Sequence, residues 1–344
     1  MDGRGVLLGA IDQRRKYTVE KTDEIRRLLS ESEALVGEVA CVCVTGSYGR
    51  LEASRYSDLD LFIVGRNKKT DGTTQGHVRI LESELTRLNE ICVKADLIAT
   101  ARSIGINDFD ADGRYLVHYS VSQLVGMLGR PEDDSANTFT ARLLMLLEGR
   151  PLIGQSAFGT AIDDIIASYW RDYEDHRNDF APAFLSNDIL RLWRTFCVNY
   201  EARTANTPHD KKLKRRVKNY KLKFSRLLTC YSALLQILRS YNVDGTVSPA
   251  DMKTICSKTP IERIADLRAD GRMSSAASEL DLIIELYNEF LEVTDEPESN
   301  LLLKFDDQTK RSKLLSSSYA FADAIFRATT AIGGGSRMHR MLVV

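Results

Sequence analysis

The spacing of hydrophobic residues divides the chain into a first part, in which strands alternate with helices, and a second part that is helical throughout. Short hydrophobic runs predict strands at about residues 39–45, 58–64 and 91–99. Helices are predicted at about residues 13–36, 47–53, 78–89, 113–128 and 140–148. From about residue 156 onward, no run is typical of a strand. We therefore expect an α/β domain with a mixed sheet, followed by an all-helical domain.

The limit between the two domains is expected near residues 150–156, where Gly149 and Pro151 interrupt the last helix of the first part. Gly333-Gly334-Gly335-Ser336 near the C-terminus indicates a frayed end. The predicted limits are 1–152 for the α/β domain, 153–332 for the helical domain and 333–344 for a flexible tail.

The most informative segment lies around the second predicted strand. Gly46 and Ser47 follow a hydrophobic run; a glycine lets the backbone approach a phosphate, and Ser47 offers a hydroxyl and an N–H at the start of a helix. Asp58 and Asp60 are two residues apart in a strand-like stretch, so they project from the same face. Two adjacent carboxylates repel each other unless a cation lies between them, and Mg²⁺ is commonly held by one or two carboxylates plus substrate phosphates. Each half alone is typical of a solvated turn, but together they indicate nucleotide chemistry.

The stretch GSYGRLEASRYSDLDLFIV resembles the polymerase β-like nucleotidyltransferase superfamily. Within it, the stretch is most similar to bacterial uridylyltransferases of nitrogen-regulatory proteins and to glutamine-synthetase adenylyltransferases. The resemblance is strong over this stretch and loose beyond about residue 150. It implies that Gly46, Ser47 and Arg50 bind the nucleotide phosphates, and that Asp58 and Asp60 are catalytic residues that bind Mg²⁺.

In this superfamily a third carboxylate completes the metal site, usually from a neighbouring strand. Asp96 is the candidate, because it is the only acidic residue in the predicted strand at 91–99 and would be costly to bury without a partner. The alternative is a strand-end residue that faces solvent or pairs with a lysine. Asp108, Asp110 and Asp112 have the spacing of half a calcium loop, but the distal glutamate is missing, so we interpret them as a solvated turn.

The predicted helical domain contains a strongly basic run, in which residues 211–223 include eight lysines and arginines. In the resembling transferases, a helical domain closes over the nucleotide and a basic helix often faces the cleft. Lys218, Lys223 and Arg226 are the candidates for binding the triphosphate, which carries more negative charge than one or two Mg²⁺ ions neutralise. A solvated basic helix face is the alternative.

Composition limits the remaining classes of protein. The 47 basic and 48 acidic residues nearly balance, so the net charge of the molecule does not favour binding to nucleic acid or to an anionic membrane. No apolar run approaches the ~20 residues needed to cross a bilayer, and the N-terminus lacks the order of a secretory signal. The six cysteines are scattered without a C-x-x-C motif, so we expect a reducing cytoplasm.

We therefore predict a Mg²⁺-dependent nucleotidyltransferase that moves NMP from an NTP to an acceptor hydroxyl. Two Mg²⁺ ions held by Asp58, Asp60 and Asp96 are expected, and ATP is the first candidate donor, although no residue identifies the base. A protein side chain is the first candidate acceptor by resemblance. A tRNA or other RNA end is the second, because Tyr220 and Phe224 are interleaved with the basic run. A non-catalytic protein that binds nucleotide or RNA is the third reading; the sequence leaves the oligomeric state open.

Overall fold

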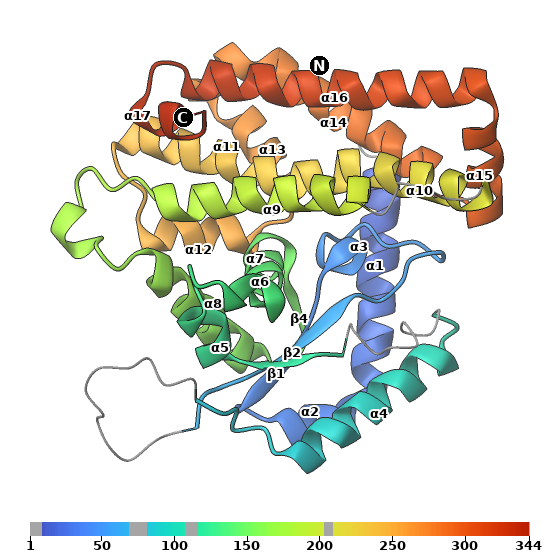
Figure 1. Ribbon diagram of the computed structural model, residues 1–344, viewed down its shortest axis with the longest axis vertical. Coiled ribbons are helices and arrows are strands. Elements are labelled where there is room, and N and C mark those ends of the chain that lie inside the picture. The colour runs from blue at the N-terminus through green and yellow to red at the C-terminus, as the bar shows by residue number, and fades with distance from the viewer. Residues whose placement is uncertain (1–8, 69–80, 107–115, 203–208, 344) are drawn as a thin grey trace. The chain divides into compact units, whose positions relative to one another are not determined.

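The strands and most of the C-terminal helices lie in different units of the chain (Figure 1). The computed structural model describes residues 9–68, 81–106, 116–202 and 209–343. One unit is Arg14–Arg171, and the other combines Met1–Gln13 with Asp172–Val344. Helix α1 (Gly9–Leu28) contributes residues to both units.

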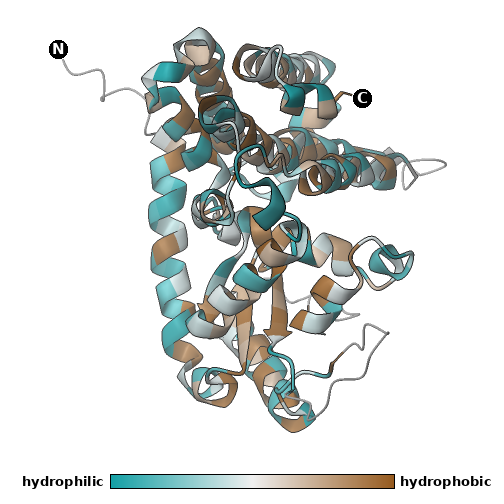
Figure 2. Cartoon of the chain, turned by 90° about the vertical axis from the view of Figure 1, so that its left-hand side faces the viewer, coloured by the Kyte–Doolittle hydropathy of each residue, from teal (hydrophilic) through white to brown (hydrophobic). Residues whose placement is uncertain are grey.

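A mixed sheet organises the unit Arg14–Arg171. Among the described residues its strands are β1 (Ala40–Val44), β2 (Leu61–Gly65), β3 (His118–Ser120) and β4 (Arg150–Ile153), in the order β3-β2-β1-β4. Strand β1 is antiparallel to β2 and β4, whereas β2 and β3 are parallel. Every residue of β1 and β2 is buried. The strands of the sheet are mostly coloured as hydrophobic in Figure 2. The predicted mixed sheet is therefore confirmed.

Short and medium helices accompany this sheet, and apolar residues of several of them complete its core. The helices are α2 (Ser30–Val36), α3 (Gly46–Gly49), α4 (Arg87–Ser103), α5 (Val121–Gly126), α6 (Glu132–Ser135), α7 (Thr138–Glu148) and α8 (Gln155–Tyr169). Val36 of α2 and Val93 and Leu97 of α4 join Val42 and Ile63 of the strands in one buried cluster. Burial of such side chains is the main force that holds a helix on a sheet.

The strand predicted at 91–99 is wrong, because these residues form the middle of α4. Thr86 begins this helix by accepting a hydrogen bond from the backbone N–H of Asn89. Val93 and Leu97 are buried four residues apart, which is the spacing of one helix face. The helix predicted at 113–128 is also partly wrong, because β3 precedes the short helix α5 in that region.

The limit between the units lies after Arg171 and not at 150–156. Strand β4, which was not predicted, pairs with β1, so a limit at residue 152 would cut the sheet. The predicted flexible tail contains helix α17 (Arg337–Met341), which begins where Ser336 accepts a hydrogen bond from the N–H of His339. Met338 of this helix is fully buried, so hydrophobic contact holds this part of the tail in place.

The other unit is helical over the residues that the structure describes, as predicted. Its long helices α16 (Gln308–Gly333) and α14 (Ala277–Val293) run side by side, and α16 also packs on α11 (Leu227–Asp244) (Figure 1). The other helices are α9 (Ala183–Ala202), α10 (His209–Lys221), α12 (Pro249–Ser257), α13 (Pro260–Ala269) and α15 (Glu298–Asp306), with short 3₁₀ segments at Glu174–His176 and Gly271–Ala276. No described helix has the length and apolar character required of a membrane span.

Candidate active site

Pairing of β1 with β2 brings the Gly-Ser turn against the second aspartate. Val44, the last residue of β1, pairs with Leu61, the first residue of β2. The N–H of Thr45 donates to the carbonyl oxygen of Asp60 at 2.8 Å, which extends this pairing by one residue. Gly46 has a φ of +62°, and a Cβ at this position would overlap the Oδ2 atom of Asp60. A glycine is therefore required here, both for the left-handed backbone and for the close approach of the carboxylate.

The two aspartates lie in an extended segment just before β2. Leu59 between them is buried in the core of the sheet, whereas Asp58 is exposed and Asp60 is partly exposed. This alternation is the one expected of extended backbone, in which neighbouring side chains point to opposite faces. The burial pattern agrees with the predicted geometry of the pair, although β2 begins at Leu61 and not at residue 58. Two carboxylates beside a Gly-Ser turn fit a Mg²⁺ ion that takes its other ligands from substrate phosphates and water.

Asp96 lies elsewhere in the same unit. It is on α4, and its carboxylate accepts a hydrogen bond from the Ser32 hydroxyl of α2 at 2.7 Å. Within the described part of the chain, no three His, Cys, Asp or Glu side chains are gathered as a metal site requires. The structure therefore does not bring Asp96 to Asp58 and Asp60, because the strand on which that prediction rested is a helix. The acidic residues 108, 110 and 112 lie outside the described residues.

Glu148, which the sequence reading missed, holds the Gly-Ser turn in place. Its side chain is fully buried at the end of α7. The Oε1 atom accepts a hydrogen bond from the backbone N–H of Gly46 at 2.8 Å, and Oε2 accepts one from Nη1 of Arg50 at 2.9 Å. One carboxylate therefore binds both ends of the turn.

Arg50 has a structural role in this arrangement, in contrast to the predicted contact with nucleotide. Its buried guanidinium donates to Glu148 and, through Nε, to Oε2 of Glu52 at 2.8 Å. The N–H of Gly46 is likewise bonded to Glu148, which leaves the partly exposed Ser47 as the candidate phosphate ligand of the turn. A signal for Glu148 was present in the sequence, since a glutamate in the last turn of a helix opposes the helix dipole and needs a compensating partner.

The comparison with known families agrees with this geometry. Residues 24–103 match the family model of the nucleotidyltransferase domain. The match includes Gly46, Ser47, Asp58 and Asp60, and it supports the polymerase β-like superfamily and a transferase activity that moves NMP. No curated protein and no solved structure shows a significant match to the chain. Glu148, which anchors the turn of the nucleotidyltransferase domain, lies beyond the matched residues.

The basic residues predicted to bind the triphosphate lie in the helical unit, outside the nucleotidyltransferase domain. Lys218 is exposed on α10. Lys223 and Arg226 lie on a π-helical turn, Leu222–Arg226, between α10 and α11. The ammonium group of Lys223 is 4.2 Å from the ring centroid of Tyr319, and the guanidinium of Arg226 is 5.2 Å from that of Phe196. Cation–π contacts and a π-helical turn, which is often found at functional sites, orient these two cations.

The aromatic residues of the same segment belong to the core. Tyr220 and Phe224 are buried, and their rings contact each other and Phe290 with centroid distances of 4.7 to 5.6 Å. Bases of a nucleic acid stack only on aromatic rings that they can reach. The rings of Tyr220 and Phe224 therefore do not support the binding of RNA bases.

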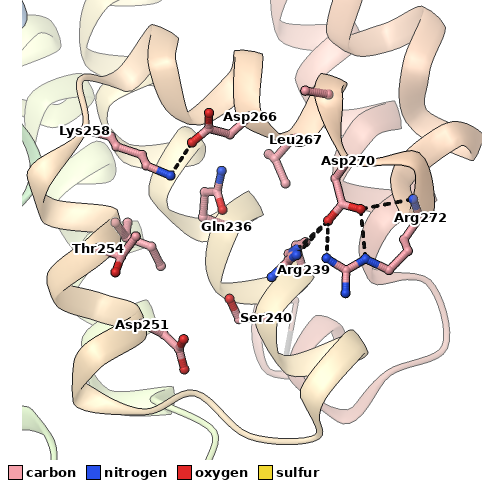
Figure 3. A pocket seen from close by; sticks show the side chains of 12 residues that line it. Gln236, Arg239, Ser240, Asp251, Thr254, Lys258, Asp266, Leu267, Asp270 and Arg272 are labelled. Atoms are coloured by element: carbon pink, nitrogen blue, oxygen red, sulfur yellow. Dashed lines mark hydrogen bonds and ion pairs between the residues drawn. The ribbon is translucent and has the colours of Figure 1, made fainter.

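A separate hollow of about 420 Å³ lies in the helical unit, between α11, α12 and α13 (Figure 3). Asp270 lies between Arg239 and Arg272 and accepts hydrogen bonds from both, and Lys258 pairs with Asp266. These arginines and this lysine are therefore compensated by carboxylates within the hollow.

Proposed function

We propose that this protein is a Mg²⁺-dependent nucleotidyltransferase that moves NMP from an NTP to the hydroxyl of an acceptor. The observation that carries the proposal is the position of the Gly46-Ser47 turn against Asp60, with the exposed Asp58 two residues away. A close approach for phosphate and a pair of metal-binding carboxylates are the two parts that this chemistry needs. The match of residues 24–103 to the nucleotidyltransferase domain supports the same class of reaction.

Each residue has a stated role in the proposed reaction. Asp58 and Asp60 would hold Mg²⁺, which when bound neutralises charge on the triphosphate. The Ser47 hydroxyl donates a hydrogen bond to a phosphate oxygen, and Glu148 keeps the turn in position. The acceptor oxygen loses its proton to solvent and forms a bond to the α-phosphorus, while the bond from the α-phosphorus to the oxygen that bridges it to the β-phosphorus breaks, so pyrophosphate leaves. A second Mg²⁺ would take its ligands mainly from substrate oxygens, because Asp96 is held by Ser32.

ATP as the donor and a protein as the acceptor remain parts of this proposal. The protein acceptor rests on resemblance. It is favoured over an RNA acceptor because Tyr220 and Phe224 are buried. A non-catalytic nucleotide-binding protein is the less favoured reading, because Asp58 and Asp60 retain the arrangement that catalysis needs. We also propose a reducing compartment such as the cytoplasm, since all six cysteines are free thiols.

A transfer assay with a cell lysate tests the proposed function. The purified protein is incubated with lysate, Mg²⁺ and each of the four NTPs in turn, labelled at the α-phosphate. We expect label from ATP to migrate with a protein and to survive ribonuclease but not protease. EDTA should remove the transfer, because the donor phosphates then lack their cation. Label that is lost with ribonuclease would assign an RNA acceptor, and no transfer from any NTP would contradict the proposal.

Replacement of Lys218, Lys223 and Arg226 by glutamine tests the role of the basic segment. We expect the Michaelis constant for the NTP to rise about tenfold or more, because each lost hydrogen bond to a charged phosphate is worth roughly 1.5–3 kcal/mol. The matched control replaces three exposed lysines elsewhere in the helical unit, Lys253, Lys310 and Lys313. If the residues bind RNA instead, nucleotide binding stays constant and the salt dependence of RNA binding flattens by nearly one log–log unit per lost phosphate contact. If neither the Michaelis constant for the NTP nor the salt dependence of RNA binding changes, the three residues belong to a solvated helix face.

A further inference from the structure

A second cluster of reactive groups lies near the end of β2 that is farther from Asp60. His118 begins β3 and pairs in register with Ile63 of β2. Its Nε2 atom is 2.9 Å from the hydroxyl oxygen of Ser83, and its Nδ1 atom is 3.2 Å from Oε2 of Glu90 on α4. A hydroxyl, an imidazole and a carboxylate in this order and at these distances form the arrangement of an activated serine nucleophile.

The partners of the imidazole determine which nitrogen carries its proton when it is neutral. Burial raises the pKa of the Glu90 carboxyl, but hydrogen bonds from Lys94 and His118 outweigh this effect and lower it to about 2. An ionised carboxylate only accepts hydrogen bonds, so Nδ1 of His118 must be the donor to Glu90. Nε2 is then the acceptor of a hydrogen bond from the Ser83 hydroxyl. The N–H of Leu85 also donates to the Ser83 oxygen at 3.1 Å, which favours negative charge on that atom.

The surrounding fold leaves space for this contact and for a small substrate. Gly65 at the end of β2 faces the cluster, and a Cβ there would overlap the Ser83 hydroxyl and lie 3.0 Å from Nε2 of His118. All three members of the cluster line a hollow of about 350 Å³. Ser83 is partly exposed, whereas Glu90 is almost fully buried. This volume lies at the lower end of the range for small-molecule sites.

We propose that Ser83, His118 and Glu90 form a second catalytic site that hydrolyses short carboxylic esters. The Ser83 oxygen attacks the ester carbonyl while its proton passes to Nε2 of His118. The bond to the alkoxy group then breaks, and His118 returns the proton to the leaving alcohol. Water attacks the resulting acyl-serine by the same route and releases the carboxylic acid and free Ser83. Glu90 touches no reacting atom; it is a positioning residue that orients the imidazole and stabilises its protonated form.

A fluorophosphonate probe tests the nucleophile directly, because attack by Ser83 displaces fluoride and leaves a covalent adduct. We expect one adduct per chain, located at Ser83 by mass spectrometry of the digested protein, and hydrolysis of p-nitrophenyl acetate. Ser83→Ala should lose both the adduct and the hydrolysis while it keeps nucleotidyl transfer. The matched control is Ser103→Ala, which removes an exposed serine hydroxyl of α4 that bonds only to Thr100 of the same helix among the described contacts.

Two further variants separate catalysis from a purely structural network. His118→Gln should slow the labelling of Ser83 about 100-fold or more, as the loss of a general base does. Glu90→Gln should slow it less, because the amide retains most of the shape. A circular-dichroism spectrum and nucleotidyl transfer report whether each variant is folded. Absence of an adduct at Ser83 in the folded wild-type protein, or labelling of His118→Gln at the wild-type rate, overturns the proposal and leaves a network that only joins α4 to β3.

Discussion

Replacement of both Asp58 and Asp60 by alanine is expected to abolish nucleotidyl transfer. Charge stabilisation at a metal-assisted phosphoryl site is worth several kcal/mol, so the turnover number should fall by about a thousandfold or more. The free energy of unfolding should change by no more than about 1 kcal/mol, because the two side chains are exposed or partly exposed. Transfer of label from the NTP and urea-induced unfolding measure the two quantities on the same preparation.

Asp96→Ala is the matched control for this double variant. Asp96 is an aspartate within residues 24–103, the range that matches the family model, as Asp58 and Asp60 are. Its carboxylate, however, is held by Ser32 on α2. We expect Asp96→Ala to keep most of the transfer activity and to lose about 1 kcal/mol of stability with that hydrogen bond. Loss of activity in folded Asp96→Ala would instead support its predicted role as a metal ligand. Wild-type turnover in the double variant, or full activity in EDTA, would exclude the metal-dependent mechanism.

Glu148→Ala is expected to have the largest effect on stability and to reduce transfer as well. The variant leaves the buried guanidinium of Arg50 with one fewer carboxylate and the N–H of Gly46 without its acceptor. Removal of one partner from a buried ion pair typically costs about 3–5 kcal/mol. The Gly-Ser turn would then lose its anchor, so the NTP should bind more weakly even when the protein is kept folded at low temperature.

The control is Glu24→Ala, which breaks the partly exposed pair of Glu24 with Lys21 in the same unit. Such a pair contributes about 0.2–1 kcal/mol, so the free energy of unfolding of this variant should lie close to that of the wild type. Glu148→Gln retains an oxygen that can accept from the N–H of Gly46 but loses the charge that compensates Arg50. We expect its free energy of unfolding to lie between those of the wild type and Glu148→Ala. Equal stability of Glu148→Ala and Glu24→Ala would show that the buried carboxylate does not support the turn.

The local motif was readable from the sequence because its parts are close along the chain. A hydrophobic run, Gly46-Ser47 and a second run led by Asp58 and Asp60 form one hairpin-like unit, so pairing of neighbouring strands is enough to bring them together. The helical half was predictable for a similar reason, since hydrophobic spacing of three and four residues is a local property. The basic segment was recognised as a helix that continues into the core, and Phe224 and Leu228 are fully buried there.

The errors in the sequence reading arise where local preference and tertiary context disagree. Residues 91–99 contain Ile and Val, which favour strands. However, Val93 and Leu97 bury one helix face, and the Lys94–Glu90 pair supports that helix. The third metal ligand was therefore placed on an element that does not exist. Strands β3 and β4 have three and four residues, too few for a periodic pattern to reveal them.

The sequence by itself determined the kind of chemistry and the residues that are adjacent in the motif: a flexible turn for phosphate and two carboxylates on one face. Only the tertiary structure decided what holds that motif in place. Glu148 reaches Gly46 across 102 positions of the chain, and His118 reaches Ser83 across 35. Such contacts depend on which strands pair and on which faces are buried, and no local pattern of polar and apolar residues encodes a particular distant partner. The turn of the nucleotidyltransferase domain is thus readable from the sequence, whereas the contact of Glu148 with that turn is readable only from the fold.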